Sequence, residues 1–218
     1  MRPTRRLLAA GALVVGALWA GAAAAQDVAR GEQLYNLCSQ CHGAQGEGSA
    51  LALAPSIAGL ESWYVEAQLH KFREGSRAGH FDDLAGMRMR GMARWLKSED
   101  DLKSVAAYVA SLAPVRPATT LVGDPTKGAA LYPVCAGCHG MNGEGVQAVG
   151  GPSLNRVSDW YLLTQLKNYK QGIRGGDPRD VTGSAMRPMA MILADEQAMK
   201  DMIAHIATLG APATGGSE

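Results

Sequence analysis

Two five-residue motifs contain all four cysteines of the chain. Cys38-Ser39-Gln40-Cys41-His42 recurs 97 residues later as Cys135-Ala136-Gly137-Cys138-His139. Cys-x-x-Cys-His is the attachment signature of c-type haem. In such a site the two thiols add across the vinyl groups of the haem, and the histidine becomes a ligand of its iron. The sequence therefore predicts two covalent haem c groups, with His42 and His139 as axial ligands.

The motifs belong to a duplication that covers most of the chain. Residues 27–112 align with residues 124–209 without gaps, and 32 of the 86 aligned positions are identical. A repeat of this length is a whole domain rather than one turn of a solenoid. We therefore expect two tandem domains with the same fold.

The duplication and the composition of the remaining segments predict where the leader, the domains, the linker and the tail begin and end. Three arginines, an apolar run and an Ala-x-Ala sequence at the start are typical of a cleaved signal peptide. An uncleaved leader is the alternative, because Leu7–Ala25 carries no charge. Export predicts a periplasmic location. The expected parts are a signal peptide (1–25), domain 1 (26–113), a linker (114–123), domain 2 (124–210) and a disordered tail (211–218).

The charge of the chain excludes some classes of partner. Without the leader, the chain has 18 basic and 20 acidic residues, which gives a net charge of −2. This balance argues against nucleic-acid binding, and it leaves a partner or an uncleaved leader as the route to a membrane. Domain 1 carries 9 basic and 11 acidic residues, and domain 2 carries 8 of each. Net charge alone thus predicts reactions with redox partners that depend weakly on salt.

Apolar periodicity predicts a mostly helical fold without strands. A short amphipathic stretch leads into each Cys-x-x-Cys-His motif, and a glycine-rich loop follows it. A second helix is expected to start with Ser62 or Asp159 as its N-cap and to end at Gly75 or Gly172. A last helix is expected to begin near Ser98 or Asp195, ahead of apolar residues at helical spacing. Gly31 and Gly128 are expected to let the first and last helices cross closely.

The sequence resembles class I c-type cytochromes. The resemblance rests on these two motifs, on the Gly-x-x-Gly-x-Gly loops beside them and on a Met seven residues before a Leu in each half. The tandem arrangement is similar to the cytochrome c4 family of di-haem electron carriers. The resemblance covers essentially all of the chain after the leader. It implies an all-α fold, with two small helical bundles that each surround a haem, and it implies His/Met ligation of both irons.

The repeat narrows the choice of the second axial ligand. Of ten methionines, only two pairs occur in both halves: Met89 with Met186, and Met92 with Met189. The resemblance places the ligands seven residues before Leu96 and Leu193, which selects Met89 and Met186. Met92 and Met189 are the alternative, and they could instead pack on the porphyrin. His70, His80 and His205 are not duplicated, so surface or packing roles are expected for them.

Other duplicated residues are candidates for contacts around the haem. The resemblance implies that the carbonyl groups of Pro55 and Pro152 accept a hydrogen bond from the proximal histidines, which would fix the imidazole orientation; ordinary loop prolines are the alternative. Haem propionates need hydrogen-bond donors when partly buried. Recurring polar and aromatic side chains could supply them, or could serve only in helix packing: Trp63, Tyr64, Gln68, Arg77 and, in the second half, Trp160, Tyr161, Gln165, Arg174.

Closed His/Met ligation favours an electron carrier over an enzyme, because no iron position stays open to peroxide. We expect a periplasmic carrier of single electrons between a quinol-oxidising complex (a quinol–cytochrome c reductase) and a terminal oxidase. The alternative is a dedicated subunit of a dehydrogenase or oxidase complex, and a di-haem peroxidase is the third possibility. A shared zinc site is disfavoured because the two cysteine pairs lie in separate domains.

Overall fold

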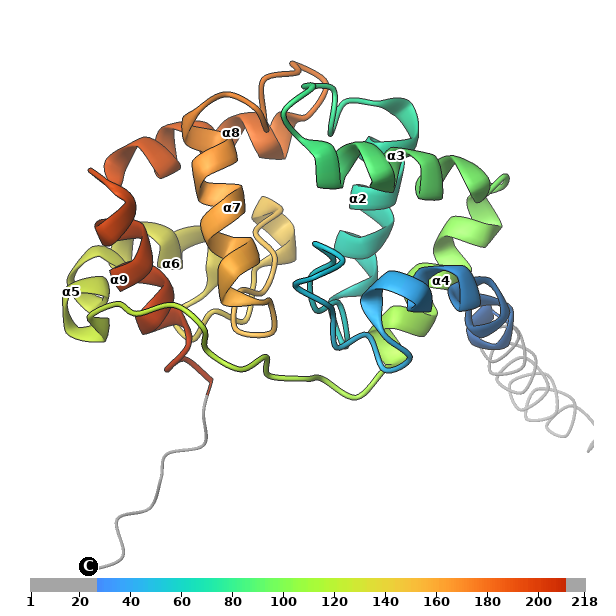
Figure 1. Ribbon diagram of the computed structural model, residues 1–218, viewed down its shortest axis with the longest axis horizontal. Helices are drawn as coiled ribbons and strands as arrows, with labels where there is room; N and C mark the ends of the chain where they lie inside the picture. Colours follow the sequence, from blue (N-terminus) through green and yellow to red (C-terminus); the bar gives the residue numbers. More distant parts are fainter. Residues whose placement is uncertain (1–26, 211–218) are drawn as a thin grey trace, which may run out of the picture.

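The computed structural model describes residues 27–210, so the predicted signal peptide and disordered tail lie outside the described residues. Two helical units lie side by side, joined by an irregular segment that runs along one edge (Figure 1). Within the described residues there is no strand, only two isolated bridges. The helical segments are residues 27–42, α2 (Ser62–Glu74), α3 (Leu84–Trp95), α4 (Glu99–Ser111), α5 (Pro125–Leu131), α6 (Pro133–His139), a 3-10 turn η1 (Gln147–Val149), α7 (Asp159–Lys170), α8 (Val181–Ile192) and α9 (Glu196–Ile206).

The first and last helices of each unit cross at a glycine, as the sequence predicts. A Cβ atom added to Gly31 would lie 2.0 Å from the carbonyl oxygen of Ser104 in α4, and one added to Gly128 would lie 2.1 Å from that of Asp201 in α9. Any side chain at these positions would force the helices apart. One turn later, Tyr35 packs against Tyr108 in unit 1, and in unit 2 His205 takes that place beside Tyr132. The crossing is therefore retained in both units despite the change of partner.

The predicted helix ends are partly confirmed. Ser98 and Asp195 cap α4 and α9 by accepting hydrogen bonds from Asp101 N and Ala198 N. Gly75 ends α2 in the left-handed conformation, as expected. The N-caps of α2 and α7 are Glu61 and Ser158 instead of the predicted Ser62 and Asp159, which are the first helical residues.

Asp159 has another structural role. Its carboxylate accepts hydrogen bonds from the backbone of Thr120 and Leu121, and it thereby ties the connecting segment to α7. Burial raises the pKa of Asp159, but these hydrogen bonds outweigh it and hold the pKa below its usual value. A further hydrogen bond, donated by Trp160 N to Asp159 Oδ1 at 2.6 Å, connects the same carboxylate to the first turn of α7.

The two methionine-bearing segments form helices that were not predicted from the sequence. Asp83 and Asp180 cap α3 and α8 by accepting from the amides of Gly86 and Gly183 at 3.0 Å. The duplicated Asp-x-x-Gly spacing is the local signal, since an Asp side chain at the N-cap satisfies an amide two or three residues later. Both helices run along the same edge of the molecule, one in each unit (Figure 1).

The two units meet through reciprocal contacts. Ser56 in unit 1 donates its amide to Ser158 Oγ, and the equivalent Ser153 donates its hydroxyl to Glu61. Glu61 and Ser158 are themselves equivalent positions of the repeat. Contacts that exchange in this way indicate an approximate twofold relation between the units, as expected when two copies of one fold bury the same surface against each other.

One contact between the units has no equivalent in the repeat. Lys71 Nζ in α2 lies 2.6 Å from Asp180 Oδ1 and 2.6 Å from Thr182 Oγ1 at the start of α8. The Lys71 side chain is 15% exposed and the Asp180 side chain 1% exposed. The positions that correspond to Lys71 and Thr182 in the repeat are Asn168 and Ala85, which cannot form this ion pair. The pair therefore attaches α8 of unit 2 to unit 1 on one side only.

We predict that Lys71→Met lowers the free energy of unfolding by about 3 kcal/mol, because removing one member of a buried ion pair leaves the other charge unpaired. Guanidinium chloride unfolding of the holoprotein, followed by circular dichroism, measures this. Lys103→Met is the control, since Lys103 is exposed and outside every ion pair among the described residues. Equal stability of the two variants would show that the ion pair does not hold the units together.

Candidate functional site

Both Cys-x-x-Cys-His motifs lie at the C-terminal end of a helix, the segment 27–42 in unit 1 and α6 in unit 2. Residues three and four apart on a helix share one face. Each pair of thiols and its histidine are therefore presented together on one side of the helix. The four cysteines form no disulfide, and Cys38 and Cys135 are half-buried. Burial raises the pKa of the Cys38 thiol to about 11 and that of Cys135 in the same direction.

Each motif histidine is buried and oriented by a proline carbonyl. His42 Nδ1 lies 2.8 Å from the carbonyl oxygen of Pro55, and His139 Nδ1 lies 2.8 Å from that of Pro152. A carbonyl oxygen only accepts, so Nδ1 carries the proton and Nε2 keeps its lone pair. Burial lowers the pKa of both imidazoles, and the hydrogen bonds to proline oppose this only in part. Both rings are therefore neutral and suited to bind a metal through Nε2.

The proline loop is held in place by a glycine. Gly48 adopts φ +85°, and a Cβ atom added to it would lie 2.4 Å from Ser56 N and 2.6 Å from the carbonyl carbon of Pro55. Gly145 has φ +86° and the same relation to Ser153 and Pro152. The glycine thus lets the loop after the motif pass directly behind the proline carbonyl. This is the residue-level reason for the last glycine of each Gly-x-x-Gly-x-Gly sequence.

One continuous, largely apolar cavity connects the two motifs. It is lined from both units. Its walls include both motif histidines, three of the four cysteines and all four methionines of the duplicated pairs: Cys38, Cys41, His42, Met89, Met92, Cys135, His139, Met186 and Met189. Met89 and Met186 are half-buried, whereas Met92 and Met189 are exposed. Residues three apart on a helix point in similar directions. Both methionines of each pair therefore reach the cavity.

Arg77 and Arg174 lie where the two units meet and line this cavity. Arg77 donates to Gln68 in its own unit and to Tyr161 in the other, and Arg174 donates to Gln165 in its own unit and to Gln68 in the other. Their Nε atoms are buried and have no hydrogen-bond partner within the part of the chain that the structure describes. Such a donor on a cavity wall suits an anionic group, since an unpaired buried donor is costly.

The tryptophans proposed beside these arginines do not line the cavity. Tyr64 and Tyr161 line it, and Trp63 and Trp160 are absent from its walls. The cavity wall thus contains the tyrosine of each Trp-Tyr pair and not the tryptophan. Sequence reasoning could not tell which of the two it would be.

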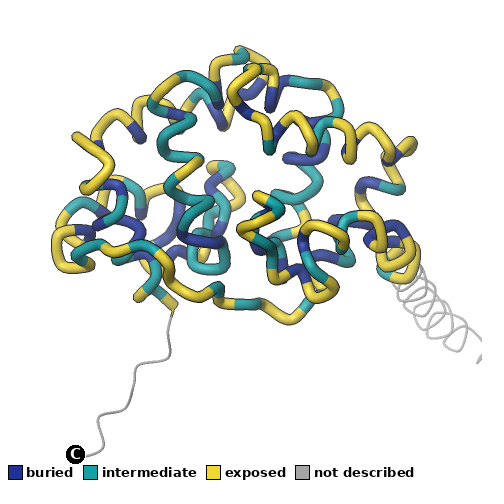
Figure 2. The backbone as a smooth tube through the Cα atoms, viewed as in Figure 1, coloured by how far each residue is buried: buried dark blue, intermediate teal, exposed yellow. Residues whose placement is uncertain are grey.

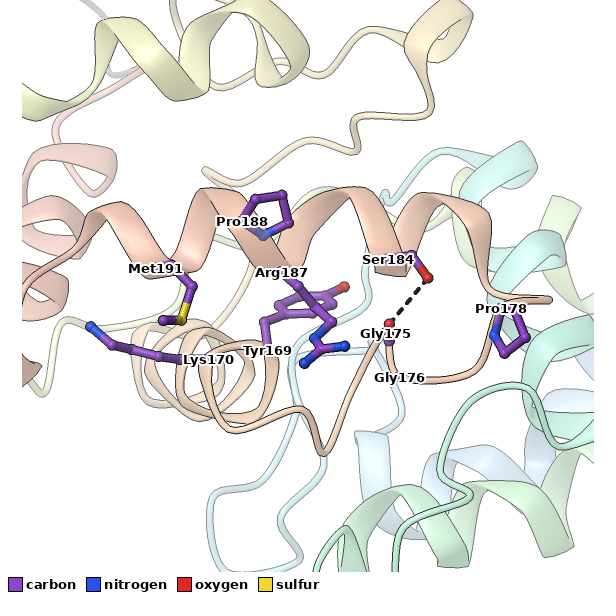
Figure 3. Close-up of a pocket in the computed structure, with 9 residues that line it drawn as sticks. All are labelled: Tyr169, Lys170, Gly175, Gly176, Pro178, Ser184, Arg187, Pro188 and Met191. Atoms are coloured by element: carbon purple, nitrogen blue, oxygen red, sulfur yellow. Dashed lines mark hydrogen bonds between the residues drawn. The ribbon is translucent and has the colours of Figure 1, made fainter.

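A second hollow lies beside α8 and has a volume of about 580 Å³. Figure 3 shows Arg187 and Met191 extending from α8 toward the end of α7 and the loop after it, while Ser184 Oγ donates to the carbonyl of Gly175. Its lining contains no histidine or cysteine, so it cannot hold a haem iron in the predicted way. It is separate from the candidate site.

The residues present fit two haem groups and do not fit a structural metal ion. Each half of the cavity offers a neutral imidazole with a free Nε2 and methionine side chains from the helix α3 or α8. Both thiols of the first motif line the cavity, and in the second motif Cys135 does. The unpaired Arg77 and Arg174 Nε atoms suit propionate groups. Within residues 27–210 there is no cluster of three or more His, Cys, Asp or Glu that could hold a metal ion.

In the same range, no helix is both long and apolar enough to span a bilayer.

Comparison with known proteins agrees with this geometry. The family model for cytochrome c matches residues 28–113 and again residues 125–210. Cytochrome c4 of Pseudomonas aeruginosa is 32% identical over 71% of this chain and 76% of its own length. A thiosulfate dehydrogenase electron acceptor of Thiomonas intermedia is 34% identical over 89% of this chain and 87% of its own length. The crystal structure of reduced cytochrome c4 from Pseudomonas stutzeri has a TM-score of 0.66 at 28% identity, and covers 84% of this chain and 98% of that one.

The chain therefore belongs to the cytochrome c family, and its tandem units place it with the di-haem, class I, cytochrome c4-like members. It binds two haem c groups covalently, through Cys38 and Cys41 and through Cys135 and Cys138. It is a di-haem electron carrier. The expected all-α fold of two tandem domains is confirmed.

We predict that Gly48→Ala lowers the free energy of unfolding by about 1–3 kcal/mol, the range for a residue forced into an unfavourable backbone conformation. It should also move the Pro55 carbonyl away from His42, which changes the haem methyl shifts of unit 1 in paramagnetic NMR. Gly91→Ala is the control, because nothing lies within 4 Å of its added Cβ atom. That change in the interior of α3 should stabilise the protein by roughly 0.5–1 kcal/mol. Unchanged stability of Gly48→Ala would contradict the role of this glycine.

Proposed function

We propose that this protein carries single electrons in the periplasm, from a quinol-oxidising complex to a terminal oxidase. When bound, each haem iron supplies the one-electron chemistry by changing between the ferrous and ferric states. The chain holds the two sites in one cavity. The observation that carries the proposal is the duplicated donor set, since a buried histidine and a methionine-bearing helix border the cavity in each unit.

We propose that Met89 and Met186 would hold the iron of each haem together with His42 and His139. Met89 packs against the core of unit 1, on the side of α3 that also buries Gly86 and Ala93. Met92 and Met189 lie on the more exposed sides of the same helices. A ligand needs an ordered position, and the half-buried methionine of each pair has more surrounding contacts to provide one.

Methionine ligation on both irons would close them to peroxide and would favour the ferrous state. Thioether sulfur raises the potential of a haem compared with a second imidazole. A carrier with high potentials suits the oxidising end of a respiratory chain. The same closure is the reason to propose a carrier that is not an enzyme.

We predict that Met89→Ala and Met186→Ala each remove the long-wavelength methionine-to-iron band of one haem and lower its midpoint potential. Axial ligands shift haem potentials over a range of about 0.8 V, so a fall on the order of 0.1 V is expected. Spectroelectrochemistry with magnetic circular dichroism measures both effects. Met92→Ala and Met189→Ala are the matched controls and should keep both bands. Loss of the band in the controls instead would assign the ligands to Met92 and Met189.

A second candidate function is supported by a relative. The Thiomonas intermedia protein is named as the electron acceptor of a thiosulfate dehydrogenase, and it aligns with most of this chain. On that reading, the protein receives electrons from one dehydrogenase and works as its dedicated partner. The arrangement of the haem cavity is equally suitable for this role, so a measurement with partners must decide between the two.

Periplasmic location is part of the proposal. The features of residues 1–25 are those of a secretory signal peptide. These features support maturation of the protein after export.

The proposed carrier role predicts that the purified holoprotein is monomeric in sedimentation and accepts electrons from a quinol–cytochrome c reductase. It should then reduce a terminal oxidase, and it should turn over no peroxide. Stopped-flow kinetics with each partner, and a peroxide assay on the half-reduced protein, test this. Fast reduction by thiosulfate dehydrogenase together with a stable complex would favour the second function. Peroxide turnover would contradict both.

A further inference from the structure

The exposed side of α3 differs in charge from the equivalent side of α8. In α3, the exposed residues at helical spacing are Leu84, Met87, Arg88, Gly91, Met92 and Trp95, of which Arg88 and Met92 lie at the rim of the haem cavity. Figure 2 shows both methionine-bearing helices largely exposed along the edge of the molecule. The corresponding residues of α8 are Val181, Ser184, Ala185, Pro188, Met189 and Ile192. Both faces are apolar, but only that of α3 contains a cation.

Two more cations flank the face of α3. Arg94 and Lys97 are exposed at its C-terminal end, and the repeat has Met191 and Ala194 at these positions. Unit 2 therefore lacks all three of the positive charges that unit 1 places here. We call Arg88, Arg94, Lys97 and the exposed residues Leu84, Met92 and Trp95 the α3 face.

The cations of the α3 face are not neutralised by the protein. Arg88, Arg94 and Lys97 donate to the backbone carbonyls of Ala52, Arg73 and Arg94, which carry no net charge. Among the described residues, no carboxylate lies within 4.0 Å of any of the three. Of the acids close to these cations in sequence, Glu99 pairs with Arg73 and His70, and Asp83 caps α3.

The α3 face also borders the haem site of unit 1. Arg88 and Met92 both line the haem cavity, and Arg88 reaches across its rim to Ala52 in the loop that follows the motif. A partner seated on this face would lie next to the haem of unit 1. A cation at the C-terminal end of α3 interacts favourably with the helix dipole, which explains one cation there. This effect does not explain Arg88, which lies in the middle of the helix.

We propose that the α3 face is the docking surface for an acidic redox protein, and that unit 2 lacks this specificity. The proposal rests on the carrier function given above. An apolar surface with positive charges around it suits a transient redox complex. In such a complex, charges guide the encounter and a small apolar centre makes the contact. The net charge of unit 1 is negative, so this surface is a local feature that total charge conceals. The two haems would then exchange electrons with different partners.

The first test maps the surface with hexacyanochromate(III), a trianion that does not react with the haem. It is added to the reduced holoprotein, and the broadening of backbone amide signals is followed by NMR. Broadening is expected around residues 84–97 and not around residues 181–194. Broadening of equal strength in the two segments, or centred near Lys127 or Lys200, would overturn the proposal.

Unit 2 provides the residues for a matched variant. Arg88→Ala, Arg94→Met and Lys97→Ala introduce the residues that unit 2 has at the same positions, so the triple variant should fold. It should lose the broadening, whereas the control Lys103→Ala with Lys127→Ala should keep it. The reverse triple variant Ala185→Arg, Met191→Arg, Ala194→Lys should create broadening around residues 181–194. An unchanged map in either triple variant would contradict the assignment.

The second test measures oxidation of the reduced protein by hexacyanoferrate(III). One electron passes from ferrous haem to the complex, which becomes hexacyanoferrate(II), and no proton moves. At low ionic strength the triple variant should react roughly tenfold more slowly, the scale of electrostatic steering. Oxidation by the cationic tris(phenanthroline)cobalt(III) should not slow. If both reagents slow equally, the variant has damaged the carrier itself and not the docking surface, which separates this failure from failure of the proposed function.

The third test distinguishes an acidic protein from an anionic membrane. At a gold electrode, electron transfer should be faster on a carboxylate-terminated monolayer than on a hydroxyl-terminated one, and the triple variant should lose the difference. The protein should not sediment with phosphatidylglycerol vesicles. Sedimentation that depends on the three cations would assign the face to a lipid surface and overturn the proposal.

Discussion

Each unit depends on one hydrogen bond, from Nδ1 of a buried histidine to the carbonyl oxygen of a proline thirteen residues later. This bond fixes the tautomer, leaves Nε2 for the iron and holds the ring in one orientation. The glycine behind the proline, the loop between them and the helix that carries the cysteines are all arranged around it. An imidazole buried without this partner would lose a hydrogen bond and be free to turn.

The close crossing of the first and last helices supports the same arrangement. Gly31 and Gly128 allow contact at distances that no side chain would permit, so the motif-bearing helix is held against α4 or α9. Next to this crossing, Tyr35 packs against Tyr108 in unit 1, and Tyr132 packs against His205 in unit 2. In both units the tyrosine also donates to a glycine carbonyl next to the motif. Burial raises the pKa of Tyr132 to about 12.

Duplication made two units of one fold, and divergence then made them unequal at the interface and at the surface. Arg77 and Arg174 keep the reciprocal pattern, because each donates to a glutamine of its own unit and to residues of the other. Lys71 breaks the pattern by pairing with Asp180, where the repeat has Asn168. The α3 face breaks it again, with three cations at positions where unit 2 has alanine or methionine. A symmetric scaffold thus carries asymmetric contacts.

The sequence by itself determined the cofactor, the number of sites and the domain plan, because the Cys-x-x-Cys-His spacing and the gapless repeat are local and periodic signals. It also narrowed ten methionines to two pairs by comparing one half with the other. It could not show that Tyr64 rather than Trp63 faces the cavity, or that Lys71 meets Asp180. Those outcomes depend on which faces pack together between residues up to 109 positions apart. The same holds for the α3 face, since a residue count sums charges that only the tertiary structure separates in space.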